Sequence, residues 1–522
     1  MKTRSPKLIH WLVLFTFLTR IALAFRPQEK LTERPYQDDG YYALTCGYQL
    51  AAGHGYSIDG IHPTNGVQPL IIPLYALFFQ LSNFDKWLGV RLTFILVALL
   101  DSFCVYALYR LSHLLKRDSS PPKNKILRAE ILAPLLWAFL FQNLLLNACG
   151  LETGLYGTLI ISSLWCYTHL RRNEVHGIPS GTIRWIFFGI VLGLMVLARI
   201  DGAIIVVCFA ATDFFSRNIP FSKKILPSVI FCSVALLISS PWWIYNYSAF
   251  GSIMPISGQS EALGADRLTS FIAGIRAIDF ILLTVIYIPY KMGDAFNVLL
   301  LLFFANVMFA ANRQYRIFNE LKQQFFLLPL VPLLIGSAIL VIFYVGFFGA
   351  PFFLGRYFHP LRILWLLFLS MSVPILIRHI IQFYHKFSFY RKPILIVSSM
   401  MFLGAAAFNI TSYILNFTTT KSSQAYHFGS WALSHPEEKI GLSSSGTAEF
   451  MADNIVNLDG KVNFEALKAR KQNTLGEYIV RSGITILTDW DYFSNKEQIN
   501  AAGAEFTNIG IVSGAGIYKR TR

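Results

Sequence analysis

The chain has 522 residues, of which 54% are hydrophobic and only 14% are charged. Soluble globular domains carry nearer a quarter charged residues, so this composition excludes that class and indicates an integral membrane protein. The net charge is +16. The basic residues lie in short loops between apolar segments, which is the pattern of cytoplasmic loops and argues against a nucleic-acid-binding surface.

Apolar stretches recur along the chain, and many are long enough to cross roughly 30 Å of hydrocarbon as helices. We predict a polytopic α-helical membrane protein with about eleven spans, within limits of about 10 to 13. With these spans every Lys- and Arg-rich loop falls on the inner side. The first span resembles a signal peptide, but an uncleaved anchor fits the topology better. The predicted spans are 8–25, 90–115, 129–147, 153–170, 184–199, 202–216, 225–247, 280–311, 325–348, 361–382 and 393–416.

Two apolar segments do not fit a simple span. Segment 69–82 is short and contains Pro69 and Pro73, so we predict a re-entrant or interfacial helix there. Segment 280–311 is too long for one straight span, and polar residues near Lys291 divide it into an interfacial and a crossing piece.

The composition changes after residue 416. The first part, 1–416, contains the predicted spans, and residues 417–522 are polar and mixed. Short apolar runs at 440–442 and 484–487 predict strands, and 463–470 and 474–481 predict helices. We therefore expect a small C-terminal α/β domain on the extracytoplasmic side of the membrane.

The outer loop 26–68 has the residues of a reactive site. It contains the adjacent carboxylates Asp38 and Asp39. Such a pair can take a proton from a hydroxyl nucleophile or hold a divalent cation such as Mg²⁺ or Mn²⁺. Aspartates also favour helix starts, so a capping role for a helix beginning near Tyr41 is equally compatible with the spacing.

Several motifs at outer helix ends accompany this pair. They are Asp38-Asp39-Gly40-Tyr41-Tyr42, Pro63-Thr64-Asn65-Gly66-Val67-Gln68-Pro69, Gly150-Leu151-Glu152-Thr153-Gly154, Ala198-Arg199-Ile200-Asp201-Gly202, Pro241-Trp242-Trp243, Gly355-Arg356-Tyr357-Phe358 and Asn457-Leu458-Asp459-Gly460. Taken together, the chain resembles the GT-C superfamily of polytopic glycosyltransferases over essentially its whole length. Members of that superfamily use polyprenyl-phosphate sugars.

The resemblance implies roles for individual residues. The first-loop carboxylate is the base in such enzymes, so Asp38 is the expected base, with Asp39 as its partner or alternative. The leaving phosphate requires fixed positive charge, for which Arg356 and then Arg199 are the expected ligands. Further expected substrate-binding residues are Glu152, Asp201, His62, Asn65, Gln68, Lys291 and His359. Each also has a structural interpretation: Arg356 at a helix end, or Arg199 paired with Asp201 or Glu152.

The implied reaction is an inverting transfer of a sugar from a polyprenyl-phosphate donor to a hydroxyl group of a glycan, lipid or protein. It would take place at the outer face of a bacterial inner membrane, among membrane lipids and without nucleic acid. No cofactor is certain, and a divalent cation at Asp38 and Asp39 is optional. The alternatives are an O-antigen ligase or polymerase, a transporter or flippase of lipid-linked glycans, and a non-catalytic assembly protein. The transporter alternative would use an intramembrane charge such as Asp101.

Overall fold

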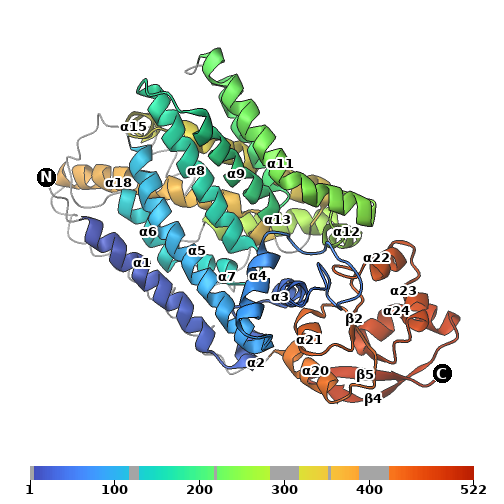
Figure 1. Cartoon of the computed structure of the whole chain (residues 1–522). Helices are drawn as coiled ribbons and strands as arrows, with labels where there is room; N and C mark the ends of the chain where they lie inside the picture. The colour runs from blue at the N-terminus through green and yellow to red at the C-terminus, as the bar shows by residue number, and fades with distance from the viewer. Residues whose placement is uncertain (1–4, 117–128, 217–219, 283–316, 351–353, 387–422) are drawn as a thin grey trace.

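The computed structural model describes residues 5–116, 129–216, 220–282, 317–350, 354–386 and 423–522. Figure 1 shows a bundle of long helices with a smaller domain of mixed helices and strands at one end. The helical part contains α1 (Ser5–Ile21), η1 (Ala22–Phe25), α2 (Gln28–Leu31), α3 (Asp38–Ala51), α4 (Ile71–Leu81), α5 (Lys86–Leu115), α6 (Ala129–Phe139), α7 (Phe141–Asn147), α8 (Thr153–Val175), α9 (Thr182–Ala198), α10 (Gly202–Phe215), η2 (Phe221–Lys223), α11 (Ile225–Phe250), α12 (Ile256–Leu263), α13 (Arg267–Leu282), α15 (Ile317–Gln324), η4 (Leu328–Leu330), α16 (Val331–Ile342), the π-helical η5 (Phe343–Phe348), α17 (Leu354–Tyr357) and α18 (His359–Lys386).

Five helices of the described residues are long and apolar enough to cross a membrane. They are Lys7–Phe25, Lys86–Leu115, Ile225–Phe250, Leu328–Phe348 and His359–Leu376. These match the predicted spans 8–25, 90–115, 225–247, 325–348 and 361–382. The membrane class is therefore confirmed, whereas the total of about eleven spans stays a prediction.

The predicted span 153–170 falls within the uninterrupted 23-residue helix α8, whereas the other predicted spans among the described residues are shorter or interrupted. Helices α9 and α10 have 17 and 14 residues, and the predicted span 129–147 is broken at Leu140, whose backbone is extended. Helix α4 has 11 residues, a length of roughly 16 Å, so it is too short to cross the hydrocarbon and has the size of the predicted re-entrant or interfacial helix. Most of 280–311 and all of 393–416 lie outside the described residues.

Buried ion pairs connect the helices of the bundle. Arg20 Nε lies 2.8 Å from Asp101 Oδ2, and Asn147 donates a hydrogen bond of 2.7 Å to the other oxygen of the same carboxylate. Arg171 pairs with Asp213 in the same manner. A buried carboxylate requires such partners because burial removes its hydration. Asp101 of α5, the charge on which the transporter alternative depended, is therefore bound by Arg20 of α1 and Asn147 of α7.

The C-terminal domain is a small α/β unit built on one five-stranded sheet. Its elements are α20 (Gln424–Leu433), β1 (Ile440–Leu442), α21 (Gly446–Met451), β2 (Ile455–Asn457), α22 (Phe464–Lys471), α23 (Leu475–Arg481), β3 (Ile486–Thr488), α24 (Asp489–Ala501), β4 (Phe506–Val512) and β5 (Ala515–Arg520). The predicted α/β character is confirmed, and the predicted strands and helices agree within two residues. The predicted boundary at 416/417 lies outside the described residues.

The sheet has the strand order β2-β1-β3-β5-β4. Strands β1, β2 and β3 are parallel, with Ile440 opposite Ile455 on one side and Ile486 on the other. Strand β5 runs antiparallel to both β3 and β4. Successive side chains alternate between the two faces, so Ile486 and Leu487 belong to two different apolar clusters.

The C-terminal domain docks on the outer loop and on α3. The backbone amides of Gly446 and Thr447 donate hydrogen bonds of 3.2 and 2.7 Å to the Asp38 carboxylate. The Thr64 hydroxyl donates to the Val462 carbonyl at 2.8 Å. A side chain at Gly66 would overlap the Lys461 carbonyl, so glycine permits this close approach. These contacts fix residues 461 and 462 of the C-terminal domain beside the outer loop.

Candidate active site

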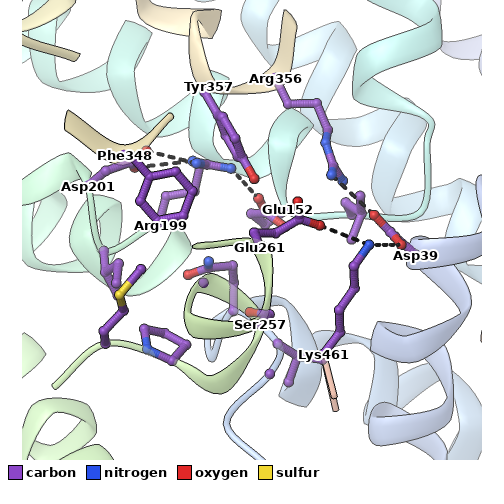
Figure 2. A pocket seen from close by; sticks show the side chains of 18 of the residues that line it. Asp39, Glu152, Arg199, Asp201, Ser257, Glu261, Phe348, Arg356, Tyr357 and Lys461 are labelled. Carbon is purple, nitrogen blue, oxygen red and sulfur yellow. Dashed lines mark hydrogen bonds and ion pairs between the residues drawn. The ribbon is translucent and has the colours of Figure 1, made fainter. Parts of the chain in front are cut away.

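A cavity of about 540 Å³ lies where the outer ends of the helices meet the C-terminal domain. We call it the charged cavity (Figure 2). Its lining includes the apolar side chains of Ile200, Ile204, Trp243, Ile253, Met254, Phe343 and Phe348. It also includes four carboxylates and three cationic side chains, which are Asp39, Glu152, Asp201, Glu261, Arg199, Arg356 and Lys461. The cavity is therefore amphipathic.

Asp39 is the centre of one network of charges in this lining. Its Oδ2 lies 3.2 Å from Arg356 Nη2, and its Oδ1 lies 3.4 Å from Lys461 Nζ. Lys461 Nζ also lies 3.0 Å from Glu261 Oε1. Figure 2 shows the Lys461 ammonium between the two carboxylates. Burial opposes the charge of Lys461, but Asp39 and Glu261 outweigh burial and raise the pKa of Lys461 above its ordinary value.

This first network joins three separate parts of the chain. Asp39 lies in the first turn of α3, where the helix dipole favours a carboxylate. Arg356 comes from α17, and Lys461 follows β2 in the C-terminal domain. The network is therefore complete only when the C-terminal domain is docked on the bundle.

Arg199 is the centre of a second network deeper in the cavity. Its guanidinium forms a two-point pair with Asp201, at 3.1 and 2.7 Å, and a third contact of 2.7 Å with Glu152. Tyr344 donates a hydrogen bond of 2.7 Å to Asp201. The Arg199 and Glu152 side chains are almost fully buried. Two carboxylates thus neutralise Arg199, and the expected pairing with Asp201 and Glu152 is present.

The two adjacent aspartates face different surroundings. Asp39 lines the charged cavity, whereas Asp38 does not. Asp38 accepts hydrogen bonds from the N-terminus of α21. Burial raises the pKa of Asp38 to about 6, against the lowering effect of those backbone hydrogen bonds. The expected helix start near Tyr41 lies earlier, since α3 begins at Asp38, and the N-cap is Gln37.

Close packing against the turn before α8 orients the start of α3. The backbone amide of Gln37 donates a hydrogen bond of 3.0 Å to the carbonyl of Cys149. A side chain at Gly40 would overlap the same carbonyl, which explains why a glycine follows the two aspartates. This contact places Asp39 beside Leu151 and Glu152 in the wall of the charged cavity.

Of the remaining predicted site residues, one lines the charged cavity and the others that the structure describes do not. Gln68 lines the charged cavity. His62 does not line it; it is exposed and pairs with Asp59 at 2.6 Å. Asn65 is buried outside it, where it donates to Asn246 and accepts from the backbone amide of Ile256.

His359 also lies outside the charged cavity, inside the bundle against Trp137 and Gly157. Thus neither predicted histidine is placed to contact a substrate in this cavity. Lys291 lies outside the described residues.

Sequence reasoning missed Lys461 and Glu261. Lys461 directly follows the Asn457-Leu458-Asp459-Gly460 motif, so that motif was the available signal. Glu261 lies in α12, a short helix in an outer segment with no motif around it. Its position facing Lys461 depends on the docking of the C-terminal domain.

The arrangement does not provide a metal site shared by the two aspartates. Asp38 accepts hydrogen bonds from backbone amides and Asp39 pairs with two cationic side chains, so a metal ion would have to displace the partners of both carboxylates. Among the described residues, no group of three or more His, Cys, Asp and Glu side chains is placed to hold a metal ion. The residues therefore do not fit the optional Mg²⁺ or Mn²⁺ at this pair.

Comparison with known proteins places the fold. No protein-family model and no curated protein matches the sequence. Among solved structures, ArnT from Cupriavidus metallidurans bound to undecaprenyl phosphate is similar, with a TM-score of 0.53, 12% identity, and 98% of each chain covered. The oligosaccharyltransferase of Archaeoglobus fulgidus in its apo form has a TM-score of 0.59 at 14% identity, covering 95% of this chain and 71% of that chain.

The same archaeal enzyme, AglB, in complex with an inhibitory peptide and a dolichol-phosphate, has a TM-score of 0.55 at 13% identity. That match covers 100% of this chain and 75% of the other chain. At these identities the similarity concerns the fold, and it extends over the helical bundle and the C-terminal domain together. The chain therefore has the fold that these solved structures share.

Proposed function

We propose that this protein is an inverting glycosyltransferase that moves a sugar from a polyprenyl phosphate to the hydroxyl group of an acceptor. The observation that carries the proposal is the amphipathic character of the charged cavity. Its apolar side chains suit the first isoprene units of a lipid, and its charged side chains suit the phosphate and sugar. A polyprenyl-phosphate sugar has the same division into an apolar chain and a polar head.

Arg356 and Lys461 are the proposed ligands of the donor phosphate. Both reach the same small region, since each lies within 3.4 Å of an Asp39 oxygen. Arg356 offers a planar fork that matches phosphate oxygens, and Lys461 offers a point charge. Arg199 is less suited to this role because Glu152 and Asp201 hold it at three points and its side chain is only 6% exposed, whereas Lys461 makes one contact to each of its two carboxylates and is 17% exposed.

Asp39 is the proposed general base, in place of Asp38. The acceptor hydroxyl gives its proton to an Asp39 oxygen while its own oxygen bonds to the anomeric carbon of the sugar. The bond between that carbon and the phosphate oxygen breaks, and its electron pair stays on the phosphate. Arg356 and Lys461, drawn from Asp39 to the phosphate, stabilise the negative charge that develops there. This single displacement inverts the anomeric carbon, and it requires no metal ion at the two aspartates.

Similarity to two lipid-phosphate complexes supports this assignment. The similar structures include ArnT with undecaprenyl phosphate and an archaeal oligosaccharyltransferase with a dolichol-phosphate. We propose the same class of lipid phosphate for this chain. We further propose that the charged cavity faces the extracytoplasmic side of a bacterial inner membrane and that the acceptor is a cell-envelope glycan, lipid or protein.

The decisive experiment replaces Asp39 with asparagine. Asparagine keeps the size of the side chain but cannot accept the proton, so transfer from radiolabelled undecaprenyl-phosphate sugars should fall by about a hundredfold or more. The assay uses membrane vesicles that contain the full chain and supplies a panel of donor sugars. Thermal unfolding of the purified variant checks that it is folded.

The matched control is Asp59→Asn. Asp59 is another carboxylate of the same outer loop, where it pairs with His62 away from the charged cavity. This control should retain transfer. Wild-type transfer rates in Asp39→Asn would remove Asp39 as the base, and absence of transfer by the wild type with every lipid-linked donor would overturn the proposed function.

A further inference from the structure

A second cavity of about 560 Å³ lies between α12 and the C-terminal domain. We call it the interdomain pocket. Most of the residues that line it have polar side chains. The residues that matter for the argument are Glu261, Lys461, Ser444, Asp459, Trp490 and Asn495.

The interdomain pocket lies at the carboxyl ends of the three parallel strands. Ser443 and Ser444 follow β1, Asp459 follows β2, and Trp490 and Asp491 follow β3. In open sheets, ligands bind outside the carboxyl ends of parallel strands, next to the point where the strand order reverses. Here the order reverses at β1, which has β2 on one side and β3 on the other.

The loop after β1 has the conformation of a constrained site. Ser444 has a φ of +52°, a left-handed value that non-glycine residues rarely adopt. The Asp459 carboxylate holds it there by accepting a hydrogen bond of 3.2 Å from the Ser444 amide. Asp491 accepts hydrogen bonds of 3.3 and 3.2 Å from the neighbouring Ser443 amide. Strained residues held in this way occur preferentially at ligand-binding positions.

The two cavities meet at one ion pair. Glu261 and Lys461 line both the charged cavity and the interdomain pocket. Their charged atoms are 3.0 Å apart, and Lys461 Nζ is a further 3.4 Å from Asp39 Oδ1. The Lys461 ammonium therefore lies between the interdomain pocket, which its side chain lines, and the proposed base. If Lys461 moves to the donor phosphate, this separation is removed.

The wall of the interdomain pocket has the chemistry of a carbohydrate site. Trp490 is 74% exposed, so its indole offers a flat apolar face with a polar edge. The axial C–H groups of a sugar ring pack on such a face. Carboxylate, hydroxyl and amide groups of Asp459, Ser444 and Asn495 surround it and match the hydroxyl groups of a sugar.

We propose that the interdomain pocket binds an uncharged saccharide, which is the acceptor or its terminal part, with the reacting hydroxyl directed past Lys461 to Asp39. This proposal rests on the proposed transfer reaction and adds to it the chemical class of the acceptor. It also gives the C-terminal domain two tasks, since that domain supplies Lys461 to the donor and Trp490 to the acceptor.

A binding experiment on the full chain tests this proposal. The protein in lipid nanodiscs is incubated with an array of uncharged oligosaccharides, and the binding constants of retained sugars are measured by calorimetry. Arrays of peptides and vesicles of anionic phospholipid form the comparison arms. We expect binding of oligosaccharides, and a loss of affinity of about tenfold in Trp490→Ala. Ser494→Trp, which fills the pocket from an exposed position, should also abolish this binding.

The matched control is Phe493→Ala. Phe493 is an exposed aromatic residue of the same helix, and it is not among the residues that line the interdomain pocket. This control should leave saccharide affinity unchanged. Binding of peptides or vesicles alone, binding of no oligosaccharide by the wild type, or unchanged affinity in both Trp490→Ala and Ser494→Trp would each overturn the proposal.

The experiment separates this proposal from the proposed reaction because binding needs neither donor nor base. Asp39→Asn should bind the saccharide as the wild type does, while it loses transfer. If transfer depends on Asp39 but no oligosaccharide binds, the proposed function is supported and the saccharide site is contradicted. If oligosaccharides bind but no donor sugar is transferred, the proposed function falls.

Discussion

The charged cavity contains two ionic networks that differ in how their charges are balanced. At Arg199, one guanidinium meets two carboxylates, and all three groups come from the helical bundle. At Asp39, one carboxylate meets two cations, and one of those cations comes from the C-terminal domain. The Arg199 network lies entirely within the helical bundle. The Asp39 network joins the bundle to the C-terminal domain, and its Asp39 carboxylate contacts two cations.

We expect the Arg199 network to stabilise the fold and the Asp39 network to take part in the proposed reaction. A neutralised, buried guanidinium can leave its partners only at a large cost in desolvation, so Arg199 is expected to hold helices together. Arg356 and Lys461 share the Asp39 carboxylate, and Lys461 has Glu261 as a second partner, so an incoming phosphate can replace Asp39 at both cations. Three predictions test this difference between the two networks.

The largest effect is expected for Arg199→Ala. The substitution leaves Glu152 and Asp201 buried without their cationic partner, which should lower the free energy of unfolding by about 3–5 kcal/mol. Thermal unfolding in detergent measures the change. Glu261→Gln, in the other network, is the control and should cost much less. An unchanged unfolding temperature together with lost affinity for undecaprenyl phosphate would show that Arg199 is a donor ligand instead.

A smaller effect is expected for the two proposed phosphate ligands. Arg356→Ala should weaken undecaprenyl phosphate binding by about ten- to a hundredfold, or about 1.5–3 kcal/mol, because it removes a charged hydrogen-bond donor. Lys461→Ala should act in the same direction. Native mass spectrometry of the purified protein measures this affinity.

The control for Lys461 is Lys86→Ala. Lys86 also pairs with a carboxylate of the C-terminal domain, Asp453 at 3.1 Å, but it does not line the charged cavity. It should therefore retain the affinity. Equal loss of affinity in Lys86→Ala and Lys461→Ala would mean that both act through domain docking, and Lys461 would lose its place at the phosphate.

The smallest effect concerns Asp38 and pH. Its pKa in the folded chain is about 6, above the ordinary 3.8, so the folded state holds the proton more tightly than the unfolded state. The resulting stabilisation is complete below about pH 4 and is lost as the pH rises through about 6. Asp38→Asn cannot titrate, so its unfolding temperature should change less than that of the wild type between pH 4 and 7. Parallel pH profiles for the two proteins would contradict this assignment.

Much of the fold could be predicted because apolar length and charge position act locally. Five predicted spans match helices of sufficient length, and the two strands and two helices predicted in the C-terminal domain lie within two residues of observed elements. The motifs also indicated the correct fold family. The predicted spans 184–199 and 202–216 also agree with α9 and α10 within two residues, although these helices are shorter than a helix that crosses the membrane alone.

Hydrophobicity and motif spacing are properties of the chain, so they were sufficient to predict a membrane protein and to support the proposal of lipid-linked sugar transfer. The identity of the aspartate that faces the cavity became clear only in the folded protein. Side chains of neighbouring helix residues point about 100° apart. Asp38 therefore binds backbone amides of the docked C-terminal domain, whereas Asp39 faces the charged cavity. The same docking brings Lys461 to Asp39, a contact between residues 422 positions apart that no local pattern encodes.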